Sequence, residues 1–408
     1  MKKMNDIDVS GKSVLLRTEF NVAFDDQCNV VDDSRIRAAL PTIEALCNKG
    51  ARVIICSHLG RPWGKWDPAK SLQRLVRPLS ALLGKPVAFA GDCIGLERRK
   101  KQQTLAPSEV LLLENVRFYQ EENDNDPCFA KFLADGVDVY INDAFGTCHR
   151  PHASIAGVPR FVKEKAIGLL VEKELDAIHS FLEDTQHPAV AVVGGAKVTG
   201  KDGKIHVIRN LLKMMDVICI VGKIAYYFLK AQGVSAGATL TADTRKIDGP
   251  DSDLAQSLEE CSAILNEAAQ KGKHILLPMD SVVAHTDDDK VGIVDHDAGP
   301  MTEGMRAMDL GPRTIHMIQE HLAKANSVVW NGPAGFYEDK RFQTGSLAIA
   351  KAVEESHARS LVGGGDTLAA LKEVGMSSDR IHVCTGGGAM LAMLMGRDLP
   401  AIKALEDR

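Results

Sequence analysis

Short apolar runs alternate with amphipathic stretches along this chain, and the whole pattern occurs twice. Examples of the runs lie at 13–20, 52–57, 87–90, 110–116 and 137–142, and then at 189–195, 216–222, 274–280, 327–332, 360–365 and 381–388. Buried strands separated by helices predict parallel sheets covered on both faces. We therefore expect six strands before about residue 145 and six after about residue 188. This is an α/β fold of two doubly wound, Rossmann-like parallel-sheet domains.

The predicted domain boundaries follow from this repeat. We assign residues 1–165 to the first domain and 188–390 to the second. The stretch from about 160 to 185 has a helical pattern, and we interpret 166–187 as a hinge helix that connects the domains. Residues 391–408 are too few to form a domain. We expect them to be a C-terminal segment that packs back on the first domain.

One predicted helix contains a proline. From 33 to 50, apolar residues recur at helical spacing, with Asp32, Asp33 or Ser34 able to cap the start and Gly50 the end. Pro41 lies inside this pattern, and we expect it to kink or split the helix.

Composition and cysteine usage limit the class of protein. The apolar fraction is 45%, the charged fraction is 25% and the formal charge is −5, as in ordinary globular proteins and without the basic excess of nucleic-acid or membrane binders. No apolar run is long enough for a membrane span, and the N-terminus has no signal-peptide pattern. The nine cysteines form no CxxC pair. We therefore expect reduced thiols, no zinc cluster and a cytoplasmic location.

Basic residues gather where the strands of the first half end. They are Arg17, His58, Arg61, Arg117, His149, Arg150 and His152, together with Asn21 and with Arg35 at a helix start. Ligands of open parallel sheets bind at the carboxyl ends of strands, and guanidinium groups there favour anions. The pattern predicts a site for a small polyanion such as a phosphorylated carboxylic acid. The alternative is that each arginine is a solvated surface residue and each histidine makes a structural hydrogen bond.

Three glycine-rich turns follow predicted strands of the second half, at 194–201, 363–367 and 385–390. Glycine lets a backbone approach phosphate, and the helix that follows offers free N–H groups. There is no P-loop pattern and no clean dinucleotide fingerprint. With Lys197 beside one turn and Asp366 beside another, the turns predict a nucleotide–magnesium site, although each could be purely structural. Together the two halves indicate a phosphotransferase that closes around its substrates.

The sequence resembles the phosphoglycerate kinase family over essentially its whole length. The matching stretches are DDSRIRAALPTIEAL, SHLGRP, LLLENVRF, NDAFGTCHRPHAS, GGAKV, FLKAQG, VVWNGPAGFYE, GGGDTLAA and CTGGGA. The resemblance implies two domains with a hinge and a monomer. It implies reversible phosphoryl transfer between 1,3-bisphosphoglycerate and MgADP, which gives 3-phosphoglycerate and MgATP. No nucleic-acid or membrane partner is expected.

The resemblance also assigns site residues. Phosphoglycerate would be held in the first domain by Arg17, Glu19, Phe20, Asn21, Arg35, His58, Leu59, Gly60, Arg61, Arg117 and Arg150. Nucleotide would be held in the second by Gly195, Ala196, Lys197, Lys201, Gly222, Asn331, Pro333, Glu338, Gly364, Gly365, Asp366 and Thr367, with Asp366 taking Mg²⁺. The catalytic set would be Arg35, Lys197, Gly365 and Gly388, which act by positioning and charge neutralisation without a covalent intermediate.

The sequence departs from the family pattern in several places. Glu19 stands where the family usually has Asp, and the turn VGKIA at 221–225 replaces GGGMA. About three residues are inserted after Lys197. As a result, Lys201 fits the spacing of the family's second lysine, whereas Lys204 fits the helix that follows; we favour Lys201. Met390 replaces a common Ser.

These departures leave two alternatives to an active kinase. One is a paralogue that binds phosphoglycerate with impaired nucleotide use, and the other is an acyl-phosphate kinase for a different acid. Nucleotide affinity and a panel of carboxylic acids would distinguish them.

Overall fold

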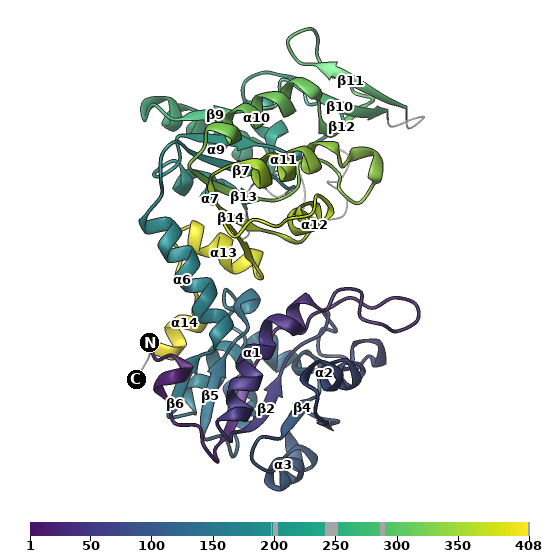
Figure 1. The fold of residues 1–408 in the computed structure, drawn as a ribbon. Helices are drawn as coiled ribbons and strands as arrows, with labels where there is room; N and C mark the ends of the chain where they lie inside the picture. The colour runs from purple at the N-terminus through teal and green to yellow at the C-terminus, as the bar shows by residue number, and fades with distance from the viewer. Residues whose placement is uncertain (197, 199–202, 241–251, 286–289, 407–408) are drawn as a thin grey trace. The chain divides into compact units, whose positions relative to one another are not determined.

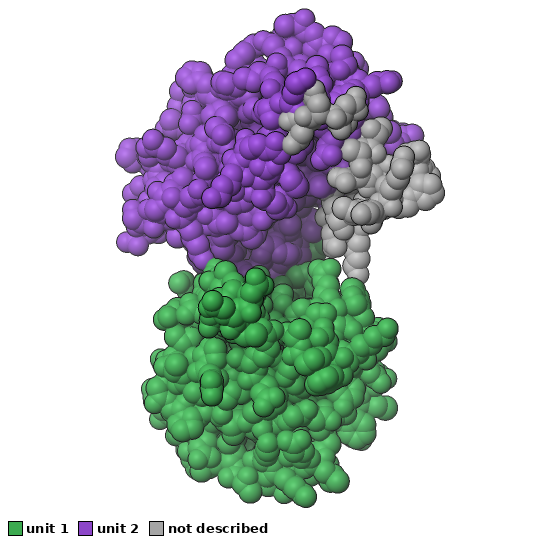
Figure 2. Space-filling view, turned by 90° about the vertical axis from the view of Figure 1, so that its right-hand side faces the viewer, with its two compact units in different colours: residues 1–177, 397–408 green, residues 178–396 purple. Residues whose placement is uncertain are grey.

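The computed structural model describes residues 1–196, 198, 203–240, 252–285 and 290–406. The chain separates into two compact units, coloured in Figure 2. Unit 1 contains Met1–Ala177 and Arg397–Arg408, and unit 2 contains Ile178–Gly396. The boundary falls inside one helix, α6 (Leu169–Glu183).

Unit 1 is built on a six-stranded parallel sheet with helices beside it (Figure 1). The sheet order is β3-β4-β2-β1-β5-β6. Its strands are β1 (Ser13–Arg17), β2 (Arg52–Cys56), β3 (Val87–Ala90), β4 (Val110–Leu113), β5 (Val139–Asn142) and β6 (Glu164–Ile167). Its helices are α1 (Ser34–Asn48), α2 (Val76–Leu83), α3 (Gly95–Thr104), α4 (Gln120–Asp124), α5 (Pro127–Leu133) and α14 (Pro400–Glu406).

Unit 2 has a second six-stranded parallel sheet, in the order β15-β14-β13-β7-β8-β9. Its strands are β7 (Ala189–Val193), β8 (Val217–Ile220), β9 (His274–Leu276), β13 (Ser327–Asn331), β14 (Arg359–Gly363) and β15 (Ile381–Cys384). Its helices are α7 (Ile205–Leu211), α8 (Lys223–Ala231), α9 (Ser252–Gln270), α10 (Pro312–Lys324), α11 (Thr344–Glu355), α12 (Gly365–Glu373) and α13 (Gly387–Leu394). The predicted α/β class with two parallel sheets is confirmed.

Three local predictions differ from the structure. The sixth strand of unit 1 is β6, which lies in the stretch predicted to be helical from residue 160; only five strands precede residue 145. Helix α1 is one continuous helix through Pro41, so that, of the two expected effects of this proline, the split does not occur. Unit 2 also has an unpredicted antiparallel sheet, in the order β11-β10-β12, formed by β10 (Asp280–His285), β11 (Val291–Asp295) and β12 (Met305–Leu310).

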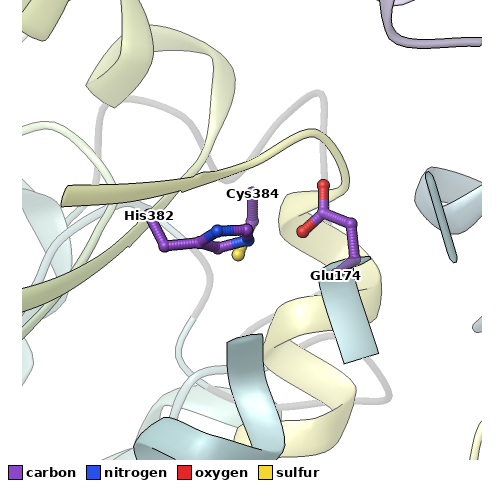
Figure 3. Close-up of side chains that lie close together, drawn as sticks. All are labelled: Glu174, His382 and Cys384. Atoms are coloured by element: carbon purple, nitrogen blue, oxygen red, sulfur yellow. The ribbon is translucent and has the colours of Figure 1, made fainter. Parts of the chain in front are cut away.

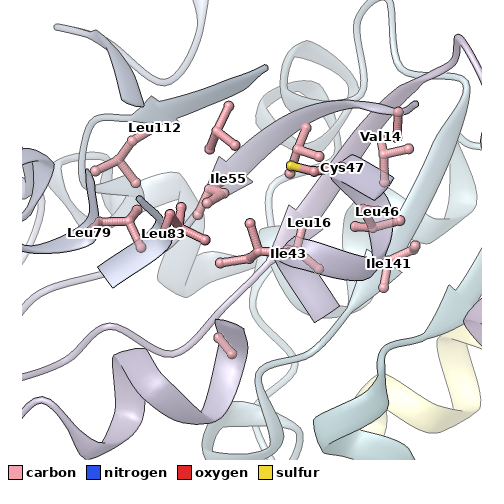
Figure 4. Close-up of a cluster of buried hydrophobic side chains, with 14 of the residues drawn as sticks. Val14, Leu16, Ile43, Leu46, Cys47, Ile55, Leu79, Leu83, Leu112 and Ile141 are labelled. Carbon is pink, nitrogen blue, oxygen red and sulfur yellow. The ribbon is translucent and has the colours of Figure 1, made fainter. Parts of the chain in front are cut away.

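The core of unit 1 explains why α1 forms and which face it buries. Ile43, Leu46 and Cys47 lie on one side of the helix and pack with sheet residues such as Leu16 and Ile55 (Figure 4). All five side chains are at most 1% exposed. Burying an Ile or Leu of this kind stabilises the fold by about 1.5–3 kcal/mol. This packing offsets the loss of a helical hydrogen bond at Pro41.

The parallel register brings the ends of three strands together in unit 1. Arg17, the last residue of β1, pairs with Cys56 of β2 on one side and with Asn142 of β5 on the other. The loops that follow these strands carry Asn21, His58, Arg61 and Arg150, while Arg117 follows the neighbouring strand β4. The carboxyl edge of the sheet therefore gathers them from distant parts of the sequence.

Candidate functional site

Several predicted phosphoglycerate residues of unit 1 are joined directly by hydrogen bonds. A guanidinium nitrogen of Arg35 donates to the Asn21 carbonyl oxygen at 2.6 Å and lies 3.4 Å from Glu19 Oε1. The Asn21 side-chain oxygen accepts from the Gly60 N–H at 2.8 Å, and Arg117 donates to the Gly60 carbonyl at 2.9 Å. The loops after β1, β2 and β4 are thereby tied into one structure.

Glu19 is a buried carboxylate that faces this group of cations. Burial raises the pKa of its carboxyl, while Arg17, Arg35, Arg117 and Arg150 act in the opposite direction. Its Oε2 atom is buried without a hydrogen-bond partner among the described residues. Four guanidinium groups around one carboxylate leave a net positive site that is suited to a polyanion.

Burial and the neighbouring cations also lower the pKa values of three basic residues of this group. The pKa of Arg117 falls to about 10, first because of its burial and then because of Arg17. The pKa of His58 falls well below its usual value for the same two reasons, and that of His152 falls to about 3 because of burial and Arg117. Both imidazoles are therefore neutral near pH 7, and the positive charge comes from the arginines.

The remaining predicted residues of this site differ in accessibility. Arg61 is exposed, and Arg150 and His149 are partly buried. Phe20 and Leu59 are buried; the Phe20 N–H donates to Ser57 and the Leu59 carbonyl accepts from Asn115. Arg17 is fully buried; its guanidinium donates to Ser154 and to the Thr18 carbonyl and lies 3.2 Å from Nδ1 of His58.

In unit 2 the loops after β7, β8 and β13 approach so closely that only glycine fits at some positions. A Cβ on Gly194 would lie 2.2 Å from the Pro333 carbonyl oxygen, and one on Gly222 would lie 2.8 Å from the Gly195 nitrogen. Gly222 also has φ 65°, which favours glycine. Gly222, the glycine retained in VGKIA, is thus required by backbone packing. Val221 is buried and Lys223 begins α8.

Two further predicted residues connect neighbouring strand ends. Asn331 donates through Nδ2 to the Gly363 carbonyl at 2.7 Å. The Thr367 hydroxyl accepts from the Gly332 N–H at 2.9 Å and is buried. Met390 packs beneath Gly363, where a Cβ would lie 2.6 Å from its sulfur.

Lys204 lies beside the ends of β7 and β13 in unit 2. Its ammonium group donates to the carbonyls of Gly194 and Asn331 and to the Asn331 side-chain oxygen. Burial lowers its pKa to about 7. Lys197 and Lys201 lie outside the described residues, and so the structure describes only one of the three lysines of this segment.

The starts of α12 and α13 present further predicted nucleotide-binding and catalytic residues. Gly364 precedes α12 with φ 114°, and Gly365 and Asp366 are exposed in its first turn. Burial and the charge of Glu338 raise the pKa of Asp366, so these two carboxylates lie near each other. Gly388 is exposed in the first turn of α13. Magnesium commonly takes one or two carboxylates plus phosphate oxygens, and an exposed Asp366 beside a helix N-terminus fits that donor set.

His382 and Cys384 occupy alternate positions of β15 and therefore share a face of that strand, as Figure 3 shows. Glu174, also labelled there, belongs to α6 in unit 1. Among the described residues, no helix has the length and apolar character needed to cross a membrane.

The fold, with an arginine-rich group at the strand ends of one α/β unit and glycine-rich turns in the other, is that of a class of kinases built from two α/β units. Comparison with known proteins names the family. The phosphoglycerate kinase family model matches residues 4–397, and the chain belongs to that family.

Full-length relatives agree with this assignment. Phosphoglycerate kinase from Chlorobium phaeobacteroides is 42% identical over 409 residues, which cover 100% of this chain and 99% of that protein. The enzyme from Gloeothece citriformis is 42% identical and covers 98% of this chain and 97% of its own length.

Solved structures agree as well. The Coxiella burnetii phosphoglycerate kinase has a TM-score of 0.80 at 39% identity, and the alignment covers 99% of this chain and 98% of that one. The Pyrococcus horikoshii enzyme has a TM-score of 0.86 at 31% identity, with 100% and 98% covered. The function is therefore that of a phosphoglycerate kinase, a phosphotransferase of glycolysis that acts on phosphoglycerate and ATP or ADP. The alternative of a paralogue with impaired nucleotide use is not supported.

Proposed function

We propose that unit 1 binds 3-phosphoglycerate and 1,3-bisphosphoglycerate through Asn21, Arg35, Arg61, Arg117 and Arg150. The observation that carries this proposal is the set of four guanidinium groups that act on the buried carboxylate of Glu19. A phosphorylated carboxylate supplies the negative charge that this site lacks. The unpaired Oε2 of Glu19 would accept a hydrogen bond from the substrate hydroxyl.

Unit 2 then binds the nucleotide through its glycine turns, with Lys197 and Lys201 at the phosphates and Asp366 at Mg²⁺. Gly195, Ala196, Gly222 and Pro333 form one wall of this site, and Glu338 contacts the ribose. Bound magnesium would neutralise phosphate charge. Asn331 and Thr367 act by holding the loops, because their hydrogen bonds go to main-chain groups of the turns.

The chemistry needs no general base, because the attacking carboxylate carries no proton. Arg35 and Lys197 would neutralise the transferring phosphoryl group, and N–H groups at Gly365 and Gly388 would assist at helix starts. Closure about the segment 166–187 would bring the substrates into line and exclude water. We propose that the enzyme acts as a cytoplasmic monomer with the domains 1–165 and 188–390 and the terminal segment 391–408.

Turnover and binding together test this proposal. A coupled assay with 3-phosphoglycerate, MgATP, glyceraldehyde-3-phosphate dehydrogenase and NADH reports formation of 1,3-bisphosphoglycerate. Calorimetry with each substrate alone reports the two sites separately. We expect turnover that requires Mg²⁺ and loss of 3-phosphoglycerate binding in Arg35→Ala. Unchanged binding in Arg35→Ala and Arg117→Ala would refute the unit 1 site.

A further inference from the structure

A chain of buried polar groups lies behind the anion site of unit 1 and does not itself reach solvent. It begins at Glu122 of α4, which is fully buried. The Ser154 hydroxyl donates to Glu122 Oε1 at 2.6 Å, and the Ser154 N–H donates to Oε2 at 2.7 Å. Both carboxylate oxygens are thus fixed by one residue.

The chain continues through Arg17. Its Nε donates to the Ser154 oxygen at 2.8 Å, and one terminal nitrogen donates to the Thr18 carbonyl. The other terminal nitrogen lies 3.2 Å from Nδ1 of His58. Since a guanidinium group can only donate, Nδ1 of His58 must accept. The proton of a neutral His58 is then on Nε2, which lies 3.7 Å from Glu19 Oε1.

We propose that Arg17 is a positioning residue that fixes the tautomer of His58, and that Glu122 holds Arg17 in place through Ser154. His58 then presents an Nε2–H donor toward Glu19 and the substrate site. This assignment changes the role predicted for Arg17, because its fully buried guanidinium acts through His58 without touching substrate. The inference rests on the proposed phosphoglycerate site of unit 1.

The surroundings keep His58 neutral as well as oriented. Charged and titratable groups from several elements of unit 1 act on His58. They are Arg17 at the end of β1, Glu19 in the loop after it, Arg35 of α1, Arg117 after β4, and His152. Burial and the arginines oppose a positive charge on the ring. Glu19, whose Oε1 lies 3.7 Å from Nε2 of His58, acts in the opposite direction, but burial also raises the pKa of the Glu19 carboxyl. A neutral donor needs its tautomer fixed, and Arg17 does so.

The test uses long-range proton–nitrogen NMR of the full chain labelled at histidine, with His58→Gln to assign the signal. We expect His58 to show Nε2–H and an unprotonated Nδ1, unchanged between pH 5.5 and 8. An Nδ1–H tautomer, or protonation in that range, would overturn the proposal without any variant.

Two variants test the anchoring of Arg17. Ser154→Ala removes the hydroxyl that connects Glu122 with Arg17. Glu122→Gln keeps the size and shape of the side chain but replaces one acceptor oxygen by an NH₂ donor. We expect either change to mix the His58 tautomers and to raise KM for 3-phosphoglycerate about tenfold with little change in kcat. One of the two variants is enough for this test, provided that it folds. A wild-type tautomer pattern together with an unchanged KM would refute the role of Glu122.

A matched control exists in the same unit. The Ser71 hydroxyl donates to Glu114 at 2.6 Å while the Leu72 N–H donates to its other oxygen. Ser71→Ala should lower the melting temperature as Ser154→Ala does, but leave the His58 signal unchanged. Titration with 3-phosphoglycerate separates the two proposals: if the His58 signal does not move, the substrate site is wrong while the tautomer result stands.

Discussion

Nζ of Lys204 lies 2.7 Å from Oδ1 of Asn331 and 2.9 Å from the main-chain oxygen of the same residue. Lys204 also donates to the Gly194 carbonyl, so its three donors hold the ends of two neighbouring strands. Within the described residues, Lys204 therefore contacts the loops that would bind nucleotide. This arrangement is consistent with a loop-holding role for Lys204, and it leaves phosphate contact by Lys201 as our proposal.

Exchanging each lysine for methionine distinguishes these roles. We expect Lys204→Met to raise KM for ATP about tenfold and to lower the melting temperature, because buried carbonyls lose their donor. Lys201→Met should weaken ATP binding without lowering the melting temperature. Calorimetry and thermal unfolding measure both. Normal ATP binding in Lys201→Met, with a stable protein, would contradict phosphate contact by Lys201.

Removal of the Lys197 side chain should affect the reaction far more than the fold. We expect Lys197→Ala to reduce kcat by about 10²–10³-fold, since a charge that stabilises the transferring phosphoryl group is lost. The melting temperature should change little. The coupled assay measures the effect, with the exposed Lys213 changed to Ala as a control for loss of one positive charge. A kcat near that of the control would refute the proposed role.

Shortening Glu19 should improve substrate binding. Its Oε1 lies 3.4 Å from Arg35, and the site surrounds the carboxylate closely enough that a Cβ on Gly146 would lie 3.5 Å from it. Glu19→Asp retracts the carboxylate by about one methylene, and we expect KM for 3-phosphoglycerate to fall several-fold. Steady-state kinetics measure KM, with the exposed Glu44 changed to Asp as a control. An unchanged KM would mean that Glu19 already makes the family contact or makes none.

Asp143 should give unit 1 a pH-dependent stability. Burial raises the pKa of its carboxyl from 3.8 to about 6, although the Leu170 and Val171 N–H groups at the start of α6 donate to it. Between these pH values the folded state binds more protons than the unfolded state. The contribution of Asp143 to the free energy of unfolding therefore decreases as pH rises from about 4 to 6, by about 3 kcal/mol.

Urea unfolding at a series of pH values, compared between wild type and Asp143→Asn, isolates this contribution. We expect the difference between the two proteins to change across pH 4–6 and to be constant above pH 7. A difference that does not vary with pH would show that Asp143 has an ordinary pKa in the folded state.

Much of the fold could be predicted because apolar runs and helical spacing are local. The strands around Leu16 and Ile55 could be predicted from continuous runs of apolar residues alone. In contrast, β6 has the sequence EKAI, and only its pairing with β5 makes it a strand. The antiparallel sheet at β10 likewise depends on pairing partners that the local sequence does not indicate.

The sequence by itself determined the two parallel α/β units, the family and the residue types of both proposed sites, because short contiguous motifs indicate each of them. Tertiary structure alone decided which of those residues are buried and which are accessible. Arg17, Glu122 and Ser154 are far apart in the sequence, and only the parallel register of β1 with β2 and β5 places Arg17 between Ser154 and His58. Burial, on which the proposed positioning role of Arg17 rests, is a property of packing between distant segments.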